Sequence, residues 1–323
     1  MLGSAGSRIG EWVFRSILSV PPLYDALHFS QLRDGKVIAR ALDSLSLRNV
    51  WPRFCAEVDA YPPDLIVSVF ATGAAAAARY KAARPDVTTV VFCTDAWVHR
   101  MWVHEGNDLY LVTSDLSAAS VRRYWPRATV EVVPRPVRAV FYDAPDRDDA
   151  RRALRIPADA RCVLLMSGSW GIGPLDEAAG RLGAADYRVL AVAGNNRALE
   201  ARLRQVAARD DRVTAFGFTD RIPELMSACD AVVTSSGDTC SEARALGRGV
   251  VLLDVVPGHG RENLLHELEL GDAAVCAPNA DSVVASVTAF LDAIEGRPPI
   301  PKASPEDWEV AFRGALRRVG FET

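Results

Sequence analysis

Short apolar runs that alternate with helical stretches are the feature that most limits the folds open to this chain. The runs lie at 65–70, 88–93, 109–113 and 129–133 in the first half, and at 162–166, 188–192, 213–216, 231–234 and 250–254 in the second. Helical stretches such as 73–83 and 115–124 separate them. Strands that alternate with helices pair in parallel and are covered on both faces. The pattern therefore predicts an α/β protein built on parallel sheets.

The length of the chain favours two domains. Its 323 residues exceed the usual size of a single core, and the composition, 49% hydrophobic and 24% charged, is that of a globular protein. The stretch 134–149 is rich in proline and charge and is interpreted as a linker. We predict an N-terminal domain over 1–140 and a second domain over 141–303. A C-terminal helix in 304–323 is expected to pack back on the N-terminal domain.

Charge and cysteine usage exclude several classes of protein. A net charge of -4 gives no reason to expect nucleic acid as a partner. The six cysteines form no CxxC pair and most lie inside apolar runs, which is typical of buried, reduced thiols. No apolar run approaches the roughly 18 residues of a membrane-spanning helix. A cytoplasmic location is expected, with peripheral contact at the inner face of the membrane left open.

The strongest indication of a binding site lies between the last two predicted strands. The run 231–234 ends in a Ser/Gly turn, and Thr239-x-x-Glu242 then matches a capping box that opens a helix. The run 250–254 leads through a Gly/His loop into another helix near Asn263. In a parallel sheet such turns meet at the carboxyl edge, where a helix N-terminus suits a phosphate. Glu242 either takes a ribose hydroxyl or only caps the helix. The segment predicts a nucleotide-sugar site.

Motifs for other cofactors are weak. The Gly-rich stretch 168–173 does not fit GxGxxG, so it gives no support for a dinucleotide site. Asp146-x-Asp148 imitates a metal-binding DxD motif, but it stands among arginines in the predicted linker and is interpreted as a solvated charge run. His and Cys spacings indicate no metal site either. We therefore expect chemistry without metal or cofactor, in which helix dipoles and backbone amides hold a diphosphate.

The first predicted helix, 8–20, is amphipathic. Its apolar residues fall on one side, and Arg8 and Arg15 lie nearby. The same pattern is found in helices that pack on a core and in helices that lie on an anionic membrane. Packing on the core is the favoured interpretation, and contact with a membrane surface stays open.

Several sequence blocks, in order, carry a family resemblance. They are PDLIVSV at 63–69, TTVVFCTD at 88–95, VPRPVRAVF at 133–141, VLLMSGSWGIGP at 163–174, AVAGNN at 191–196 and FGFTDRIPELMSACDAVVTSSG at 216–237. With these blocks the chain resembles the lipid-linked sugar transferases, which include the monogalactosyldiacylglycerol synthases and the peptidoglycan N-acetylglucosaminyltransferase. The resemblance implies the GT-B fold, with two Rossmann-like domains facing across a cleft. It also implies an inverting, metal-independent hexosyltransferase that moves a sugar from a UDP-sugar to a lipid, diacylglycerol-like hydroxyl.

The resemblance also assigns roles to residues. In the donor site these are Ser167, Gly168 and Ser169 in the first Gly-rich loop, Phe218 beside the uracil, Ser236, Gly237 and Thr239 at the diphosphate, Glu242 at the ribose, and His259 and Asn263 around the start of the next helix. Asp95 and His99 match polar residues on the acceptor side and are the catalytic candidates. Histidine titrates near neutrality and is able to take a hydroxyl proton. The alternative is a strand-end cap for Asp95 and a surface position for His99.

Three departures from the family pattern leave a second function open. Relatives begin with a strand, a Gly-Gly-Gly-His loop and a helix, and this chain starts after them, so an incomplete N-terminal domain is expected. The turn before Thr239 is one residue shorter, and His259-Gly260 replaces a Gln-Glu pair that contacts the donor sugar. The true start lies upstream, or a partner chain supplies the missing unit, or catalysis is lost. The alternative function is a non-catalytic or partner-dependent nucleotide-sugar-binding homologue, and a UDP-sugar epimerase is a further rival.

Overall fold

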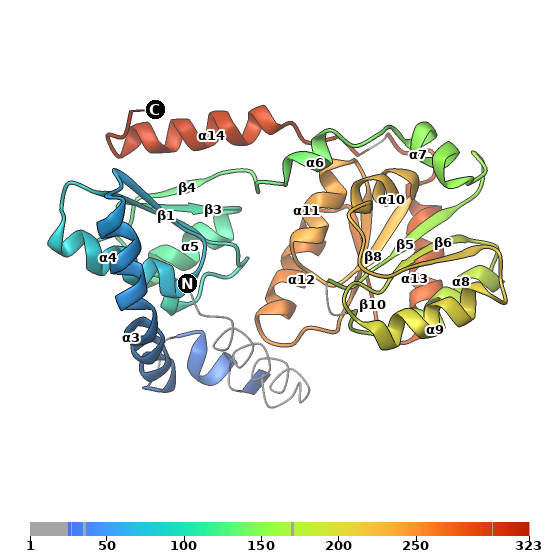
Figure 1. Ribbon diagram of the computed structural model, residues 1–323, viewed down its shortest axis with the longest axis horizontal. Coiled ribbons are helices and arrows are strands. Elements are labelled where there is room, and N and C mark those ends of the chain that lie inside the picture. The colour runs from blue at the N-terminus through green and yellow to red at the C-terminus, as the bar shows by residue number, and fades with distance from the viewer. Residues whose placement is uncertain (1–24, 27, 35–36, 169–170, 299, 323) are drawn as a thin grey trace. The chain divides into compact units, whose positions relative to one another are not determined.

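The computed structural model describes residues 25–26, 28–34, 37–168, 171–298 and 300–322. The chain forms two compact units, each with one parallel sheet (Figure 1). The first unit comprises Met1–Arg135, Pro257–Glu262 and Glu306–Thr323, and the second comprises Pro136–Val256 and Asn263–Pro305. The predicted amphipathic helix at 8–20 lies outside the described residues.

The first unit is built on four parallel strands in the order β1-β2-β3-β4. The strands are β1 (Leu65–Ser68), β2 (Thr88–Phe92), β3 (Leu109–Val112) and β4 (Val130–Val132). Its other elements are η1 (His28–Leu32), α3 (Val37–Ala60), α4 (Ala71–Ala83), η2 (Arg100–Trp102), α5 (Asp115–Tyr124) and α14 (Pro305–Arg318). All four residues of β3 are buried, as expected of a strand covered on both faces.

Alternate residues of the central strands fill two cores. Val91 and Tyr110 pack with residues of α4 and α5 on one face of the sheet. Phe92 and Leu111 pack with Leu316 of α14 on the other face. The C-terminal helix therefore covers a sheet whose strands precede it by more than 170 residues in sequence, and its burial contributes to the stability of the first unit.

The second unit holds six parallel strands in the order β10-β9-β8-β5-β6-β7. The strands are β5 (Cys162–Leu165), β6 (Arg188–Val192), β7 (Val213–Phe216), β8 (Ala231–Thr234), β9 (Gly249–Leu253) and β10 (Ala273–Cys276). The helices are α6 (Ala139–Tyr142), α7 (Arg147–Leu154), α8 (Leu175–Ala184), α9 (Arg197–Ala207), α10 (Ile222–Ala228), α11 (Asp238–Ala245) and α13 (Ala280–Ile294), together with α12 (His259–Glu269), whose first four residues belong to the first unit. Because β5 pairs with β6 on one side and with β8 on the other, the strand order reverses at β5. Such a reversal is the usual place for a ligand in this class of sheet.

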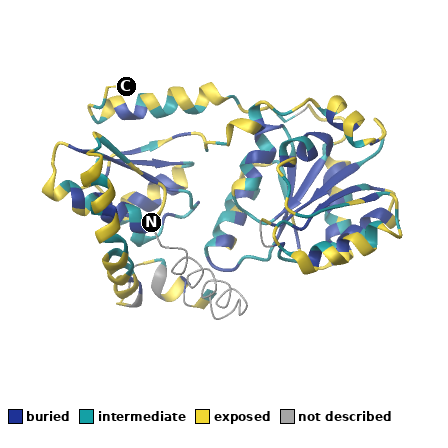
Figure 2. Cartoon of the chain, in the orientation of Figure 1, coloured by how far each residue is buried: buried dark blue, intermediate teal, exposed yellow. Residues whose placement is uncertain are grey.

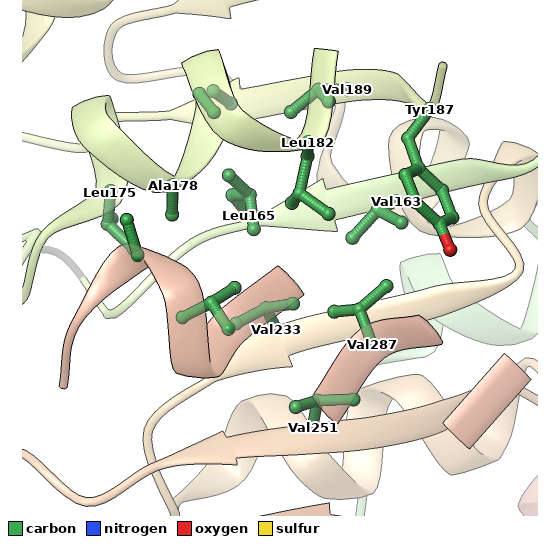
Figure 3. Packing of buried hydrophobic residues seen from close by; sticks show 14 of the residues in the cluster. Val163, Leu165, Leu175, Ala178, Leu182, Tyr187, Val189, Val233, Val251 and Val287 are labelled. Carbon is green, nitrogen blue, oxygen red and sulfur yellow. The ribbon is translucent and has the colours of Figure 1, made fainter. Parts of the chain in front are cut away.

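Both faces of the second sheet are covered. Val163 and Leu165 of β5 pack with α8, α9 and α13, and Figure 3 shows Val163 and Leu165 with Leu182 and Val287 in this cluster. Leu164 faces the opposite way, into a core with α10 and α11. The central strands β5, β6, β8 and β9 are dark in Figure 2 because almost all of their residues are buried, whereas the edge strands β7 and β10 have one buried residue each.

The predicted parallel α/β architecture is confirmed, and its strand positions agree with the sequence analysis to within two residues. Two expectations differ. The sequence pattern did not predict β10. The stretch 134–149 is more than a linker, because it contains α6 and the start of α7, and Phe141 is fully buried in the second unit. Asp146 and Asp148 of the DxD-like pair are exposed, as expected of solvated charges, and Asp146 accepts a hydrogen bond from the amide of Asp149 as the N-cap of α7.

The cysteine interpretation is confirmed. All six are free thiols, and all except Cys55 are buried. No helix within the described ranges combines the length and the apolar character needed to cross a membrane.

Candidate nucleotide site and acid–base cluster

The strand reversal brings two loops together at one edge of the second sheet. β5 and β8 are neighbours, and the backbone N–H of Met166 donates to the carbonyl of Val233 at 3.0 Å. The loop that begins at Ser167 and the turn 235–237 therefore leave the sheet side by side at its carboxyl edge. The predicted donor-site residues of the loop after β5 and of the turn before α11 are thus brought close together. Ser169 lies outside the described residues.

The loop after β5 offers an unused hydroxyl and open space. Ser167 is 3% exposed, and its Oγ has no hydrogen-bond partner among the described residues. Gly168 has a φ of +56°, and a Cβ built there meets no atom of the described residues within 4 Å. At Gly171, by contrast, a Cβ would lie 2.6 Å from Cδ2 of Leu199, so that glycine is required for packing. A buried polar group without a partner is unusual in a protein, and a ligand would satisfy it.

The helix after β8 begins at the turn and not at the predicted capping box. Gly237 is the N-cap of α11, and no side chain caps the helix, so the Thr239–Glu242 capping box was wrong. A Cβ built at Gly237 meets nothing within 4 Å. The first N–H groups of α11 therefore face space that no residue at the N-cap covers, an arrangement that suits an anion. Ser236 and Thr239 flank this turn.

Glu242 turns toward an arginine. Its Oε1 accepts hydrogen bonds from Nη2 of Arg138 at 2.9 Å and from Nε at 3.1 Å. The guanidinium also lies 5.0 Å from the ring centroid of Phe141. Burial raises the pKa of the Glu242 carboxyl, and the hydrogen bonds from Arg138 act in the opposite direction. The carboxyl is thus held in place beside the α11 turn by a contact that the sequence did not reveal.

The remaining donor candidates lie on other elements. Phe218 is 70% exposed in the loop between β7 and α10, at the same edge of the sheet. Asn263 lies inside α12, which begins at His259, so the expectation of a helix starting near Asn263 was four residues late. His259 belongs to the first unit and Asn263 to the second.

The catalytic candidates Asp95 and His99 lie together after β2. Nε2 of His99 is 3.5 Å from Oδ2 of Asp95, and the same oxygen accepts a hydrogen bond from Nε1 of Trp102 at 2.9 Å. Nδ1 of His99 is buried without a hydrogen-bond partner among the described residues. Burial lowers the pKa of His99 to about 4, and the Asp95 charge opposes this. At neutral pH the imidazole is therefore uncharged and able to accept a proton.

Three further residues join this cluster and were missed. Nε2 of His28 lies 3.0 Å from Oε2 of Glu262, and Nε of Arg33 lies 3.1 Å from Oε1 of the same carboxylate. The ring of His259 lies 6.1 Å from that of His28. Burial lowers the pKa of His259, and the Asp95 carboxylate opposes this. Since 234 residues separate His28 from Glu262, no local pattern in the sequence could have indicated the contact.

The described residues provide no cluster of His, Cys, Asp or Glu side chains, three or more together, that could hold a metal ion. At the edge of the second sheet, the loop after β5 offers the hydroxyl of Ser167 and the start of α11 offers backbone amides. These groups bind anions better than cations.

The lowered pKa of His99 predicts a loss of stability in acid. Its folded-state pKa, about 4, lies below the usual 6.5, so the unfolded state binds more protons between these values. The free energy of unfolding should therefore fall by about 1–3 kcal/mol as the pH drops from 7 to 4. In His99→Gln this part of the slope should be absent in urea titrations at several pH values. Identical pH profiles for the two proteins would contradict the buried, neutral imidazole.

Comparison with known proteins supports the family predicted from the sequence blocks. Residues 18–133 match the family model for monogalactosyldiacylglycerol (MGDG) synthase. The chain is 27% identical over 239 residues to the processive diacylglycerol beta-glucosyltransferase of Bacillus licheniformis, covering 72% of this chain and 62% of that protein. It is 27% identical over 227 residues to the chloroplastic MGDG synthase of Spinacia oleracea, covering 65% and 43%. The chain thus spans less than two thirds of the length of these relatives.

Solved structures share the fold. The S. aureus MnaA–UDP co-structure matches with a TM-score of 0.62 at 13% identity, over 87% of this chain and 82% of that chain. The UDP-GlcNAc 2-epimerase from Neisseria meningitidis, bound to UDP-GlcNAc, matches with a TM-score of 0.60 at 12% identity, over 84% and 81%. Likenesses at such low identity concern the fold alone. The predicted GT-B fold class is confirmed, and the similarity to the monogalactosyldiacylglycerol synthase family model covers residues 18–133.

Proposed function

We propose that this chain is an inverting glycosyltransferase that moves a hexose from a UDP-sugar to the hydroxyl of a hydrophobic, diacylglycerol-like lipid, without a metal ion. The observation that carries the proposal is the edge of the second sheet, where the unused hydroxyl of Ser167 and the open N-terminus of α11 lie at the strand reversal. Relatives named as diacylglycerol glucosyltransferases and MGDG synthases support the lipid acceptor.

In this proposal the donor is held by hydrogen bonds and a helix dipole. The diphosphate binds the first N–H groups of α11 and the hydroxyl of Ser167, so its negative charge is balanced without a cation. Glu242, already fixed by Arg138, accepts a ribose hydroxyl. Phe218, exposed in its loop, stacks against the uracil.

Asp95 and His99 supply the acid–base step. The Asp95 carboxylate faces Nε2 of His99 and favours the tautomer with a proton there, which leaves the lone pair of Nδ1 to accept the proton of the acceptor hydroxyl. The hydroxyl oxygen forms a bond to the anomeric carbon as the bond from that carbon to the diphosphate breaks, and UDP leaves. A single displacement inverts the configuration of the sugar.

The alternative is a nucleotide-sugar-binding homologue that needs a partner or does not catalyse. The observation in its favour is His259-Gly260, which stands where relatives carry a sugar-contacting Gln-Glu pair and lies with the first unit, beside His28. An epimerase would interconvert UDP-sugars without any acceptor, so assays with and without lipid separate these functions.

Binding of UDP is the first test. The purified chain should be stabilised by UDP, and UDP at 100 times its dissociation constant should add about 2.7 kcal/mol to the free energy of unfolding. The measurement is a thermal melt with UDP, dTDP, GDP and ADP in parallel. A shift with UDP alone supports the donor site, whereas no shift with any nucleotide in a folded sample contradicts it.

The role of Glu242 is tested by Glu242→Gln. A hydrogen bond to a charged group contributes roughly 1.5–3 kcal/mol, so UDP should bind about 10- to 100-fold more weakly. Glu224→Gln is the matched control, because Glu224 pairs with Arg221 on the surface of the same unit. Unchanged UDP affinity in Glu242→Gln, measured by calorimetry, would leave Glu242 with a structural role only.

The acid–base assignment is tested by Asp95→Asn and His99→Gln. Each should lower kcat about 100-fold or more with a lipid acceptor, because general acid–base catalysis contributes roughly 10²–10⁴. UDP affinity should stay unchanged, since neither residue belongs to the second unit. Full turnover in the double variant would end the assignment.

A further inference from the structure

A polar cavity in the first unit is lined by residues that have no role in the nucleotide site or in the acid–base cluster. It has a volume of about 160 Å³ and is lined by Ala39, Arg40, Asp43, Arg100, Met101 and His104. The first three belong to α3, and the others lie in or just after η2. One water occupies about 30 Å³, so the cavity has room for a small oxyanion or for several waters.

Two arginines, Arg40 and Arg100, line this cavity. Arg40 is exposed and has no hydrogen-bond or ion-pair partner among the described residues. Arg100 donates from Nη1 to the carbonyl of Val103 and keeps further N–H groups. The planar donors of arginine match the oxygens of phosphate and carboxylate. The cavity is therefore suited to an anion.

Asp43 makes the cavity selective among anions. Asp43 is one of the lining residues, and its Oδ1 is buried without a hydrogen-bond partner among the described residues. An ionised carboxylate repels an anion unless that anion donates a proton to it. Nε2 of His104 is 2.8 Å from the carbonyl of Met101 and donates to it. Burial lowers the pKa of His104 and so favours the neutral imidazole, in which Nδ1 is then an acceptor. The two acceptors thus require a ligand that carries a hydrogen-bond donor.

We propose that this cavity binds a phosphate-class anion that retains a P–OH group, either inorganic phosphate or a phosphomonoester. Its oxygens accept hydrogen bonds from Arg40 and Arg100, and its P–OH donates to the Asp43 carboxyl. Sulfate has the same shape but carries no proton near neutral pH. The site therefore discriminates between phosphate and sulfate, and it is independent of the nucleotide site in the second unit.

The test is calorimetric titration of the whole chain with inorganic phosphate, glycerol phosphate and sulfate at pH 6.5. Arg40→Gln should weaken phosphate binding roughly tenfold or more. Arg48→Gln, an exposed arginine of the same helix that does not line the cavity, should leave it unchanged. Asp43→Asn, which supplies an amide donor, should let sulfate bind nearly as well as phosphate.

The outcomes separate the sources and the sites. Tighter binding of glycerol phosphate identifies a monoester as the ligand, and tighter binding of inorganic phosphate identifies the free ion. Both results support the site.

Binding that falls in Glu242→Gln but not in Arg40→Gln places phosphate in the nucleotide site and overturns the proposal. Equal loss in the Arg40 and Arg48 variants, equal affinity of the unsubstituted chain for sulfate, or no binding overturns it as well.

Discussion

The pairing of β5 with β8 is the constraint on which the second unit depends. Asp230 holds the two strands together at their amino ends, since its Oδ2 accepts from the amide of Cys162 at 2.8 Å and from Nη2 of Arg151 at 2.9 Å. Arg151 is almost completely buried, and it also donates to the carbonyl of Ala228 at 2.9 Å. A buried charge of this kind is tolerated only when all its donors are used. The network fixes the register at which the strand order reverses.

The same register determines which loops lie next to each other at the opposite, carboxyl edge of the sheet. Met166 bonds across to Val233, so the loop with Ser167 and the N-terminus of α11 leave the sheet as neighbours. Structural residues at one end of two strands thereby position polar residues at the other end. In the first unit, polar residues are positioned by contacts between charged or ionisable side chains. His28 and Arg33 hold Glu262, and Asp95 pairs with His99.

Much of this architecture could be predicted from local pattern, and the limits of prediction have physical causes. Buried strands such as β3 are continuous apolar runs, so their positions follow from composition alone. β10 was missed because two of its four residues are alanine, which is depleted in strands. The capping box failed because the N-cap of α11 is Gly237, two residues before Thr239, and Glu242 bonds instead to Arg138, 104 residues away. Contacts between residues so far apart in the sequence, such as that of His28 with Glu262, produce no local pattern from which they could be predicted.

The claim that the reversal of strand order in the second unit is the nucleotide site is tested most directly by amide hydrogen exchange with and without UDP. We expect the amides of Gly168 and of the first turn of α11, including Thr239 and Cys240, to exchange more slowly in UDP. The reason is that the bound diphosphate would contact these amides or cover the residues next to them. Exchange at these amides that UDP leaves unchanged, with slowing confined to other segments, would contradict it.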